Sequence, residues 1–238
     1  MPTRIDWCDE TVNPLGHWCF GPNGTEANPQ PCEYCYARTL EARGMRGCEK
    51  CRKFEKHTNF EQLNKLKKSR KPRTIFMQSM GDLFHDEVPD HWIQEVFEAC
   101  DAAPQHRYLF LTKNPQRYME LGKASKLPID SNFWYGSTAP TPDTEFFFHE
   151  QVNTFVSIEP ILKPFSHLTD DGIPPVSRCN WIIVGAETGN RKDKTIPEKW
   201  WLAELVEFAE YTKTPIFMKE SLRELMGSDF KQQYPWEV

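Results

Sequence analysis

Six short apolar runs divide this chain of 238 residues, and they constrain its fold more than any other feature. Each run is rich in β-branched and aromatic residues and is mostly apolar on both faces, which is typical of strands buried in a parallel sheet. We expect each run to form a strand, with a further first strand near residues 4–7. The six runs are residues 74–78, 108–112, 133–137, 154–158, 181–185 and 215–219.

Helical patterns lie between some of these strands. Apolar residues recur at helical spacing in residues 91–100 and 200–208. Strands that alternate with helices or long connections imply βαβ units with right-handed crossovers. The sequence therefore predicts an α/β protein with one domain over residues 1–238, a partial or closed (β/α) barrel of six to seven parallel strands. A doubly wound open sheet is the alternative.

Polar side chains follow nearly every predicted strand, at the point where the strand ends. In a parallel barrel these carboxyl ends form one rim, where ligand sites are built. We therefore expect a site at this rim. The polar residues are Ser79, Asp82, His85, Thr112, Lys113, Asn114, Ser137, Glu159, Glu187, Lys219 and Glu220.

Cysteines are concentrated near the start of the chain, with six of the eight in the first 51 residues. Twelve residues separate Cys19 from Cys32, and Cys35 follows with Tyr34 inside the tight pair. Thiolates so close together suit an iron–sulfur cluster better than a disulfide. Because a cubane of four irons usually takes four cysteines, a set of three would leave one iron open to a small molecule. The pattern predicts a 4Fe–4S cluster on these three cysteines.

Two further cysteines, Cys48 and Cys51, leave two alternatives open. With Cys32 and Cys35 they come close to the spacing of a four-cysteine zinc site, which would make this part of the chain a binding module. Residues 36–43, however, are strong helix formers. A helix of that length spans about 12 Å and would hold the two cysteine pairs apart.

The second alternative divides the cysteines between two sites in the segment of residues 8–57. Cys48, Cys51 and His57, with Cys8 as a further ligand, would hold a separate metal ion. Thiolate and imidazole ligands together suit zinc better than a second cluster.

Charge and composition restrict the expected surroundings of the protein. The net charge is −5 at pH 7, so the surface as a whole is not expected to capture nucleic acid strongly. The basic run at residues 65–73 is either a solvated loop before a strand or a contact for a polyanion. The sequence has no signal-peptide pattern and no apolar stretch long enough to span a membrane. We expect a soluble, cytoplasmic protein without a membrane partner, and there cysteines hold metals more often than they form disulfides.

An ordered set of motifs runs along nearly the whole chain. In order, the motifs are Asp6-Trp7, Asn13-Pro14, Cys19, Cys32-x2-Cys35-Tyr36-Ala37, Ser79-Met80-Gly81-Asp82-Leu83-Phe84-His85, Leu111-Thr112-Lys113-Asn114-Pro115, Ser157-Ile158-Glu159-Pro160 and Val184-Gly185-Ala186-Glu187-Thr188-Gly189. This set resembles the radical S-adenosylmethionine superfamily, and within it a branch of phage-associated proteins with a three-cysteine motif. The superfamily usually has three residues where this chain has twelve, so Cys8 is an alternative to Cys19 as a cluster ligand.

The resemblance implies that the open iron binds the amino and carboxylate groups of S-adenosylmethionine. An electron from the cluster, supplied by a reducing donor, would cleave the sulfonium bond and release a 5′-deoxyadenosyl radical that abstracts a substrate hydrogen. By position, the cofactor's amino group would be met by Ser79, Met80, Gly81 and Asp82, and its ribose by Ser137. Glu159 and Glu187 would hold ribose hydroxyls or substrate. Lys113 and Lys219 would hold a carboxylate or phosphate.

Three functions remain open at this stage. The phage-like resemblance implies a radical enzyme of isomerase type in host cytoplasm, acting on a modified DNA base such as an amino-acid-decorated thymine. Aromatic residues expected near the rim, Trp134, Tyr135 and Phe84, would stack on that base. The second function is a radical enzyme of small-molecule or peptide metabolism, which the net charge fits equally well. The third is a non-catalytic, zinc-dependent nucleic-acid-binding protein.

Overall fold

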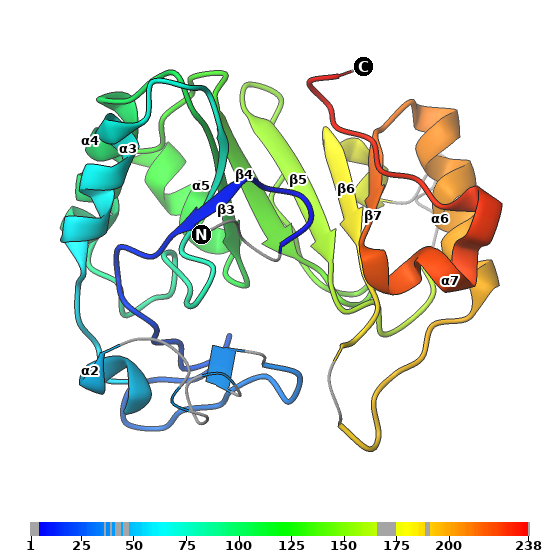
Figure 1. Ribbon diagram of the computed structural model, residues 1–238, viewed down its shortest axis with the longest axis horizontal. Helices are drawn as coiled ribbons and strands as arrows, with labels where there is room; N and C mark the ends of the chain where they lie inside the picture. Colours follow the sequence, from blue (N-terminus) through cyan, green and yellow to red (C-terminus); the bar gives the residue numbers. More distant parts are fainter. Residues whose placement is uncertain are drawn as a thin grey trace. The chain divides into compact units, whose positions relative to one another are not determined.

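Seven strands follow one another in chain order through one sheet (Figure 1). They are β1 (Glu10–Val12), β2 (Thr74–Met77), β3 (Arg107–Thr112), β4 (Phe133–Thr138), β5 (Asn153–Ile158), β6 (Trp181–Val184) and β7 (Ile216–Met218). β1, β2 and β3 pair in parallel, and so do β5, β6 and β7. The predicted α/β fold is therefore confirmed. A strand order without reversal is that of a (β/α) barrel wall, because the order of a doubly wound sheet reverses at a switch point.

The structure describes residues 5–35, 37–38, 40, 44, 48–165, 175–188 and 191–237. Contacts between residues divide the chain into two units, Met1–Tyr135 and Gly136–Val238. The helices are α2 (Glu49–Arg52), α3 (Asn64–Lys68), α4 (Asp90–Asp101), α5 (Gln116–Lys123), α6 (Lys199–Thr212) and α7 (Arg223–Met226), with short 3₁₀ turns at Phe60–Leu63, Pro175–Arg178, Glu220–Leu222 and Gly227–Asp229. Within the described ranges, no helix combines the length and apolar character that crossing a membrane requires.

The first unit has an aromatic core between its strands and helices. Phe97 of α4 packs edge-on against Phe110 of β3, with ring centroids 5.4 Å apart. Phe110 in turn stacks on Tyr135 of β4 at 5.8 Å. Phe84, in the loop after β2, contacts Tyr118 of α5 at 4.5 Å. These rings bury large apolar areas in offset and edge-to-face contacts, and they fix α4 and α5 against β3 and β4.

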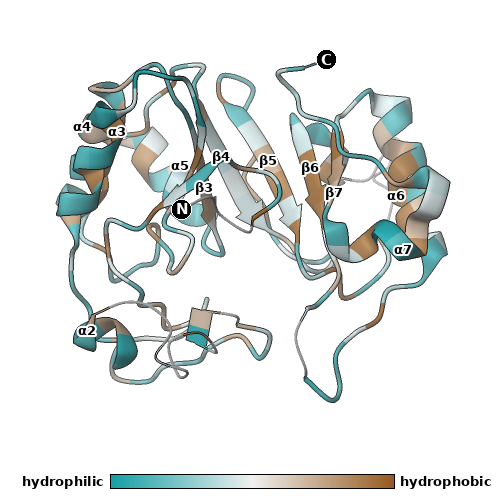
Figure 2. Ribbon diagram, in the orientation of Figure 1, coloured by the Kyte–Doolittle hydropathy of each residue, from teal (hydrophilic) through white to brown (hydrophobic). Residues whose placement is uncertain are grey.

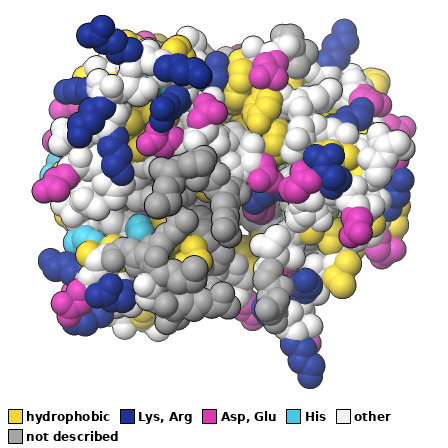
Figure 3. Space-filling view, viewed as in Figure 1, with side chains coloured by type: hydrophobic (Ala, Val, Ile, Leu, Met, Phe, Trp, Pro, Cys, Tyr) yellow, Lys and Arg dark blue, Asp and Glu magenta, His cyan; other side chains and the backbone are white. Residues whose placement is uncertain are grey.

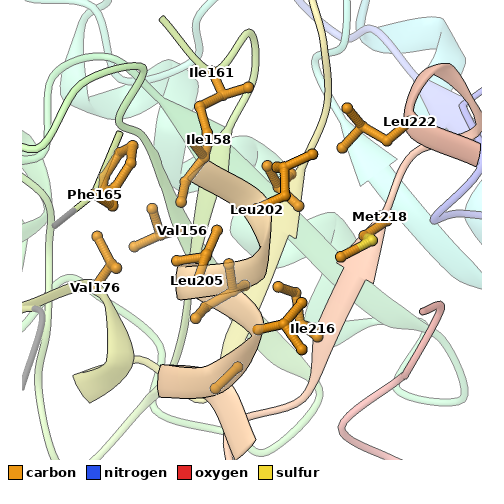
Figure 4. Close-up of a cluster of buried hydrophobic side chains, with 14 of the residues drawn as sticks. Val156, Ile158, Ile161, Phe165, Val176, Leu202, Leu205, Ile216, Met218 and Leu222 are labelled. Atoms are coloured by element: carbon orange, nitrogen blue, oxygen red, sulfur yellow. The ribbon is translucent and has the colours of Figure 1, made fainter. Parts of the chain in front are cut away.

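The second unit has an aliphatic core between its strands and α6 (Figure 4). Alternate residues of β5, β6 and β7 point toward this helix, as the two-residue period of a strand requires. From α6, Leu202 and Leu205 enter the same cluster and are fully buried. Figure 2 shows apolar β6 and β7 beside α6, whose surface alternates between apolar and polar.

The secondary structure differs from expectation mainly at the first strand. β1 begins at Glu10 rather than near residues 4–7. Asp9 precedes it, with its backbone N–H bonded to the Thr74 carbonyl and its carboxylate accepting the Thr74 N–H. Trp7 buries its ring against Phe76 instead of joining the ladder. The helices expected at 91–100 and 200–208 are confirmed as α4 and α6. Most of the helix expected at residues 36–43 lies outside the described residues.

Candidate functional site

The carboxylate of Asp82 joins the loop after β2 to the end of β3. It accepts hydrogen bonds from the Thr112 hydroxyl at 2.8 and 3.0 Å and from the Lys113 backbone N–H at 2.9 Å. Its own loop contributes a third donor, the Phe84 N–H at 3.0 Å. Asp82 is buried, so these donors replace the water that a carboxylate would otherwise need. The carboxyl ends of β2 and β3 are thereby held together.

The loop after β1 is tied to the segment after β2. The side-chain oxygen of Asn13 accepts hydrogen bonds from the Met80 N–H at 2.9 Å and the Ser79 hydroxyl at 3.3 Å. Gly81 lies against the Trp18 carbonyl, since a Cβ there would be 2.5 Å from that oxygen. The chain from 13 to 18 leads directly to Cys19. The predicted group of residues 79–82 therefore lies beside the segment that carries this cysteine.

Gln78 provides a second tie between these loops. Its backbone N–H donates to the Val12 carbonyl at 2.7 Å, in the left-handed conformation with φ 65°. Its side-chain amide accepts the Leu15 N–H at 3.0 Å and donates to the Gly16 carbonyl at 2.7 Å. Because Gln78 is buried, these bonds satisfy its amide without water.

The twelve residues between Cys19 and Cys32 form a closed loop. The Gln30 N–H donates to the Phe20 carbonyl at 2.7 Å, so the loop begins and ends at adjacent points. This approach needs a glycine at position 24, where a Cβ would lie 1.9 Å from the Phe20 oxygen. The closing bond is one residue after Cys19 and two residues before Cys32. The long spacing therefore keeps the two cysteines near each other.

His85 supports this loop from below the closing bond. The Glu87 N–H donates to His85 Nδ1 at 3.2 Å, which leaves the ring proton on Nε2. Nε2 lies 3.2 Å from the Gly21 carbonyl and 3.1 Å from the Gly24 carbonyl. Both ring nitrogens are thus used within the fold, and His85 acts as a positioning residue.

Lys113, directly after β3, lies among the three predicted cluster cysteines. Burial opposes the charge on its ammonium group, but nearby acidic groups raise its pKa above the ordinary value. These groups are, in decreasing order of effect, Cys32, Cys19, Asp82 and Tyr34. Thiols from both ends of the closed loop therefore lie close enough to one amine to interact with it electrostatically.

The surroundings of Cys19 keep its thiol protonated in the absence of a metal. Burial raises the pKa of this thiol to about 11, and the Asp82 carboxylate adds to the effect. Cys35 contributes in the same direction, while Lys113 opposes it. The Gly21 N–H donates to the Cys19 sulfur at 3.4 Å. A metal that binds here has to displace the thiol proton, since the thiolate is the ligand.

Tyr34, inside the tight cysteine pair, belongs to the same group. Burial raises the pKa of its phenol to about 12, with Cys32 as the next cause. Cys32 also shares a side-chain hydrogen bond with this tyrosine. The structure therefore brings Cys19, Cys32 and Cys35 together, and no disulfide joins any of the eight cysteines, all of which lie in the described residues.

A second group consists of Cys48, Cys51 and His57. The two sulfurs are 3.4 Å apart, and His57 Nε2 lies 3.4 Å from the Cys48 sulfur and 3.5 Å from the Cys51 sulfur. Among the described residues this is the group of three ligand atoms within 4.8 Å of one another, and it could hold a metal ion. Cys32 and Cys35 are not in this group, so the described residues do not assemble a four-cysteine site.

The two thiols of this second group differ in acidity. Burial tends to raise the pKa of Cys48, but hydrogen bonds from the backbone and thiol of Cys51 lower it below the ordinary value. The pKa of Cys51 is raised, mainly by burial. A backbone hydrogen bond from His17 to the Cys51 sulfur acts in the opposite direction.

Cys8 lies apart from both cysteine groups. It precedes β1 by one residue, at the amino end of the strand, and its sulfur is 4.0 Å from the Ile5 carbonyl. The residues around Cys19 follow the carboxyl ends of the strands. The structure therefore brings Cys8 neither to the predicted cluster nor to Cys48 and Cys51.

The basic run at residues 65–73 also lies at the amino end of the sheet. α3 and the residues after it lead into Thr74, the first residue of β2, and Arg73 forms a 2.7 Å ion pair with Glu10 at the start of β1. Figure 3 shows Lys and Arg side chains gathered over α3 and this connection. β2 has four residues and spans about 13 Å, so the run and the cysteines lie at opposite ends of the strand.

The aromatic residues expected near the rim have different positions. Phe84 and Tyr135 are fully buried in the aromatic core, and the Tyr135 hydroxyl donates to the Pro128 carbonyl at 2.7 Å. Neither ring is therefore open to a base. Trp134 precedes Tyr135 and points to the other face of β4, because successive strand residues alternate. It is the aromatic candidate that faces away from this core.

In the second unit, Ser137 and Glu159 lie on different faces of their strands. Ser137 is fully buried, and its hydroxyl oxygen accepts the Phe147 N–H at 2.9 Å. Ala139, two residues on, belongs to the aliphatic core, so Ser137 points toward the same side. Glu159, directly after β5, forms an ion pair with Lys219, directly after β7. The structure brings this acid and base together and separates Ser137 from them.

Glu187 is engaged by its own loop. Arg191 donates two hydrogen bonds to its carboxylate, at 2.7 and 2.8 Å, and the Thr195 N–H donates at 3.3 Å. The Arg191 contact lowers the pKa of Glu187, although burial opposes the shift. A paired, buried carboxylate of this kind orders the loop after β6.

The fold and these groups define an α/β protein whose parallel sheet carries a cysteine-rich segment at the carboxyl ends of its first strands. The chain belongs to the family described as protein of unknown function (DUF5131), whose profile matches residues 2–225. Comparisons with curated proteins and with solved structures each found no match.

Sequence reasoning missed two amides that build the site. Asn13 was noted only within a motif, although an Asn before a Pro is a turn signal. Gln78 was assigned to the end of a strand run, and no local pattern indicates that its side chain bridges residues 15 and 16. The groups that hold the cysteine segment come from residues more than sixty positions away along the chain, which single-sequence patterns do not relate.

We expect Glu187→Gln to destabilise the protein in a pH-dependent way. The folded-state pKa lies below the reference value of 4.5, so the carboxylate stabilises the fold above that pH and loses its contribution as pH falls through the folded-state pKa. The variant should be about 1–2 kcal/mol less stable near pH 7, with a gap that shrinks below about pH 4.5. Urea unfolding between these pH values measures it. The exposed Glu207→Gln on α6 is the control, and a gap independent of pH would contradict the assignment.

Proposed function

We propose that the protein is a radical S-adenosylmethionine enzyme whose 4Fe–4S cluster is held by Cys19, Cys32 and Cys35. The observation that supports this most is the convergence of thiols from both ends of the closed loop on Lys113. When bound, the cluster would supply the electron that cleaves S-adenosylmethionine to a 5′-deoxyadenosyl radical.

The donor set fits such a cluster in three respects. The three thiols are not paired in disulfides, and a backbone N–H from Gly21 reaches the Cys19 sulfur. Hydrogen bonds to cluster sulfurs tune reduction potentials. Their sulfurs do not form a group within 4.8 Å, as Cys48, Cys51 and His57 do. Each ligand of a cubane binds a different iron, so wider spacing than around a single ion is expected.

The chain's own residues would position the cofactor in this proposal. Asp82 accepts hydrogen bonds from three residues of its own surroundings, so its role is to fix the loop rather than to bind S-adenosylmethionine directly. Lys113 would offset the negative charge of the thiolates or hold the cofactor's carboxylate. Glu159 and Lys219 form an ion pair that a ligand would have to share or open.

The substrate class remains a proposal of its own. A modified DNA base, rearranged by an isomerase-type reaction, is the substrate that the phage-like resemblance favours. The basic run favours it less than the sequence alone did, because that run lies at the amino end of β2. This position supports the second candidate, a small molecule or peptide that needs no phosphate contacts. A non-catalytic zinc protein would be colourless, whereas iron–sulfur proteins are brown.

Cys32→Ala or Cys35→Ala is expected to abolish bound iron and the cleavage of S-adenosylmethionine. Each change removes one of three thiolates, and two cannot hold a site-differentiated cubane. Iron per chain and 5′-deoxyadenosine formation after anaerobic reconstitution are the two readouts. Cys8→Ala is the matched control and should keep both. A full cluster with normal cleavage in either variant would overturn the assignment.

Gly24→Ala tests the closed loop. The added Cβ would lie 1.9 Å from the Phe20 oxygen and 2.5 Å from the Gln30 nitrogen, so the loop cannot close without a backbone shift. We expect a loss of about 1–3 kcal/mol in unfolding free energy and lower iron occupancy. Gly122→Ala on α5, where a Cβ meets nothing within 4 Å, is the control and should retain iron. Equal iron content in both variants would show that the loop does not position the cysteines.

The basic run can be tested separately from the chemistry. Replacing Lys67, Lys68, Arg70 and Lys71 with Ser should flatten the salt dependence of binding to modified DNA by about 0.9 log units per lost phosphate contact. Formation of 5′-deoxyadenosine should not change, because the run is at the other end of β2 from the cysteines. Salt-independent turnover of a free amino acid or peptide, with no response to DNA, would favour the second candidate.

A further inference from the structure

The arrangement of Cys48, Cys51 and His57 matches three corners of a tetrahedral ion site. With Zn–S and Zn–N bonds of about 2.3 and 2.05 Å, tetrahedral geometry puts two sulfurs about 3.8 Å apart and a sulfur and a nitrogen about 3.6 Å apart. The observed separations are 3.4 Å between the sulfurs and 3.4 and 3.5 Å from each sulfur to Nε2. The sulfurs are also too far apart for a disulfide, whose bond is about 2.05 Å long.

The histidine is in the tautomer that a metal requires. His57 Nδ1 lies 2.7 Å from the Glu55 carbonyl, which can only accept a hydrogen bond. The ring proton is therefore on Nδ1, and the lone pair of Nε2 faces the two sulfurs. An outer hydrogen bond of this kind is the usual support of a metal-binding histidine. It distinguishes the group from a Cys-x2-Cys redox pair, which needs no third donor.

The same group is built against the segment that carries Cys19. The His57 carbonyl accepts the Trp18 ring N–H at 3.1 Å, and the Asn59 N–H donates to the Pro14 carbonyl at 2.6 Å. Position 16 has to be glycine, because a Cβ there would lie 2.3 Å from His57 Nε2. The backbone of His17 bonds to the Cys51 sulfur. Residues 14–18 are thus fixed to this group immediately before Cys19.

We infer that Cys48, Cys51 and His57 bind one zinc-class ion, and that this ion positions the segment leading to Cys19. A ligand set of thiolates and imidazole selects zinc among common divalent ions. Cys48 is exposed, so water can complete the tetrahedron. The inference does not rest on the proposed radical chemistry, since the site would hold its ion whether or not a cluster binds nearby.

Zinc content is the first test, on the full chain purified without iron reconstitution. The wild type should hold about one zinc per chain. Cys48→Ser/Cys51→Ser and His57→Ala should lose it, while Cys8→Ser and His91→Ala, a surface histidine on α4, should keep it. Where a variant does not fold, Co²⁺ added to chelated wild type gives the same answer through the visible bands of tetrahedral cobalt thiolate. Absence of zinc and of these bands, or a reversible Cys48–Cys51 disulfide instead, would overturn the inference.

The positioning role has a separate readout in the reactivity of Cys19. Chelation of the ion should release residues 14–18, so that Cys19 is alkylated at least about threefold faster, as measured by peptide mass spectrometry. Cys8 is the internal control and should react at an unchanged rate. Equal alkylation of Cys19 with and without zinc would limit the ion to its own loop. Neither readout involves iron or S-adenosylmethionine, so failure here is distinct from failure of the proposed enzyme.

Discussion

The buried carboxylate of Asp82 holds the parts of the site together. It takes donors from the end of β3 and from its own loop, and the neighbouring residues Ser79 and Met80 bond to Asn13 after β1. Three loops that leave the sheet at its carboxyl edge are therefore linked through buried polar groups. In a low-dielectric interior such bonds are costly to leave unmade, so they restrict the loops to one arrangement. Within it, Cys19 lies near Asp82 and Lys113.

Two groups of cysteines, with different geometry, lie close to one another along the chain. Cys19, Cys32 and Cys35 surround a partly buried lysine, and their sulfurs are not packed as around one ion. Cys48 and Cys51 lie with His57 at separations that suit a single ion. The second group contacts the backbone just before Cys19. Our account therefore gives the first group the chemistry and the second group the support of its least regular member.

The sequence predicted most of the sheet but less of the site. The apolar runs were recognisable because strands such as β2, β4 and β6 are buried on both faces. β1 was misplaced because it has only three residues, Glu-Thr-Val, with a weak pattern. Cys48, Cys51 and His57 were found because their ligands are local in sequence. Ser137 shows the opposite case, since a shift of one residue along a strand reverses its face. The basic run precedes its strand, whereas the site residues follow theirs, and that order already indicated opposite ends.

The most direct test of this account is a crystal of the anaerobically reconstituted protein, with anomalous diffraction recorded at the iron and zinc absorption edges. We expect an iron signal bounded by Cys19, Cys32 and Cys35, and a separate zinc signal at Cys48, Cys51 and His57. A single zinc signal shared by Cys32, Cys35, Cys48 and Cys51, without iron, would contradict it and identify the N-terminal segment as a zinc-binding module.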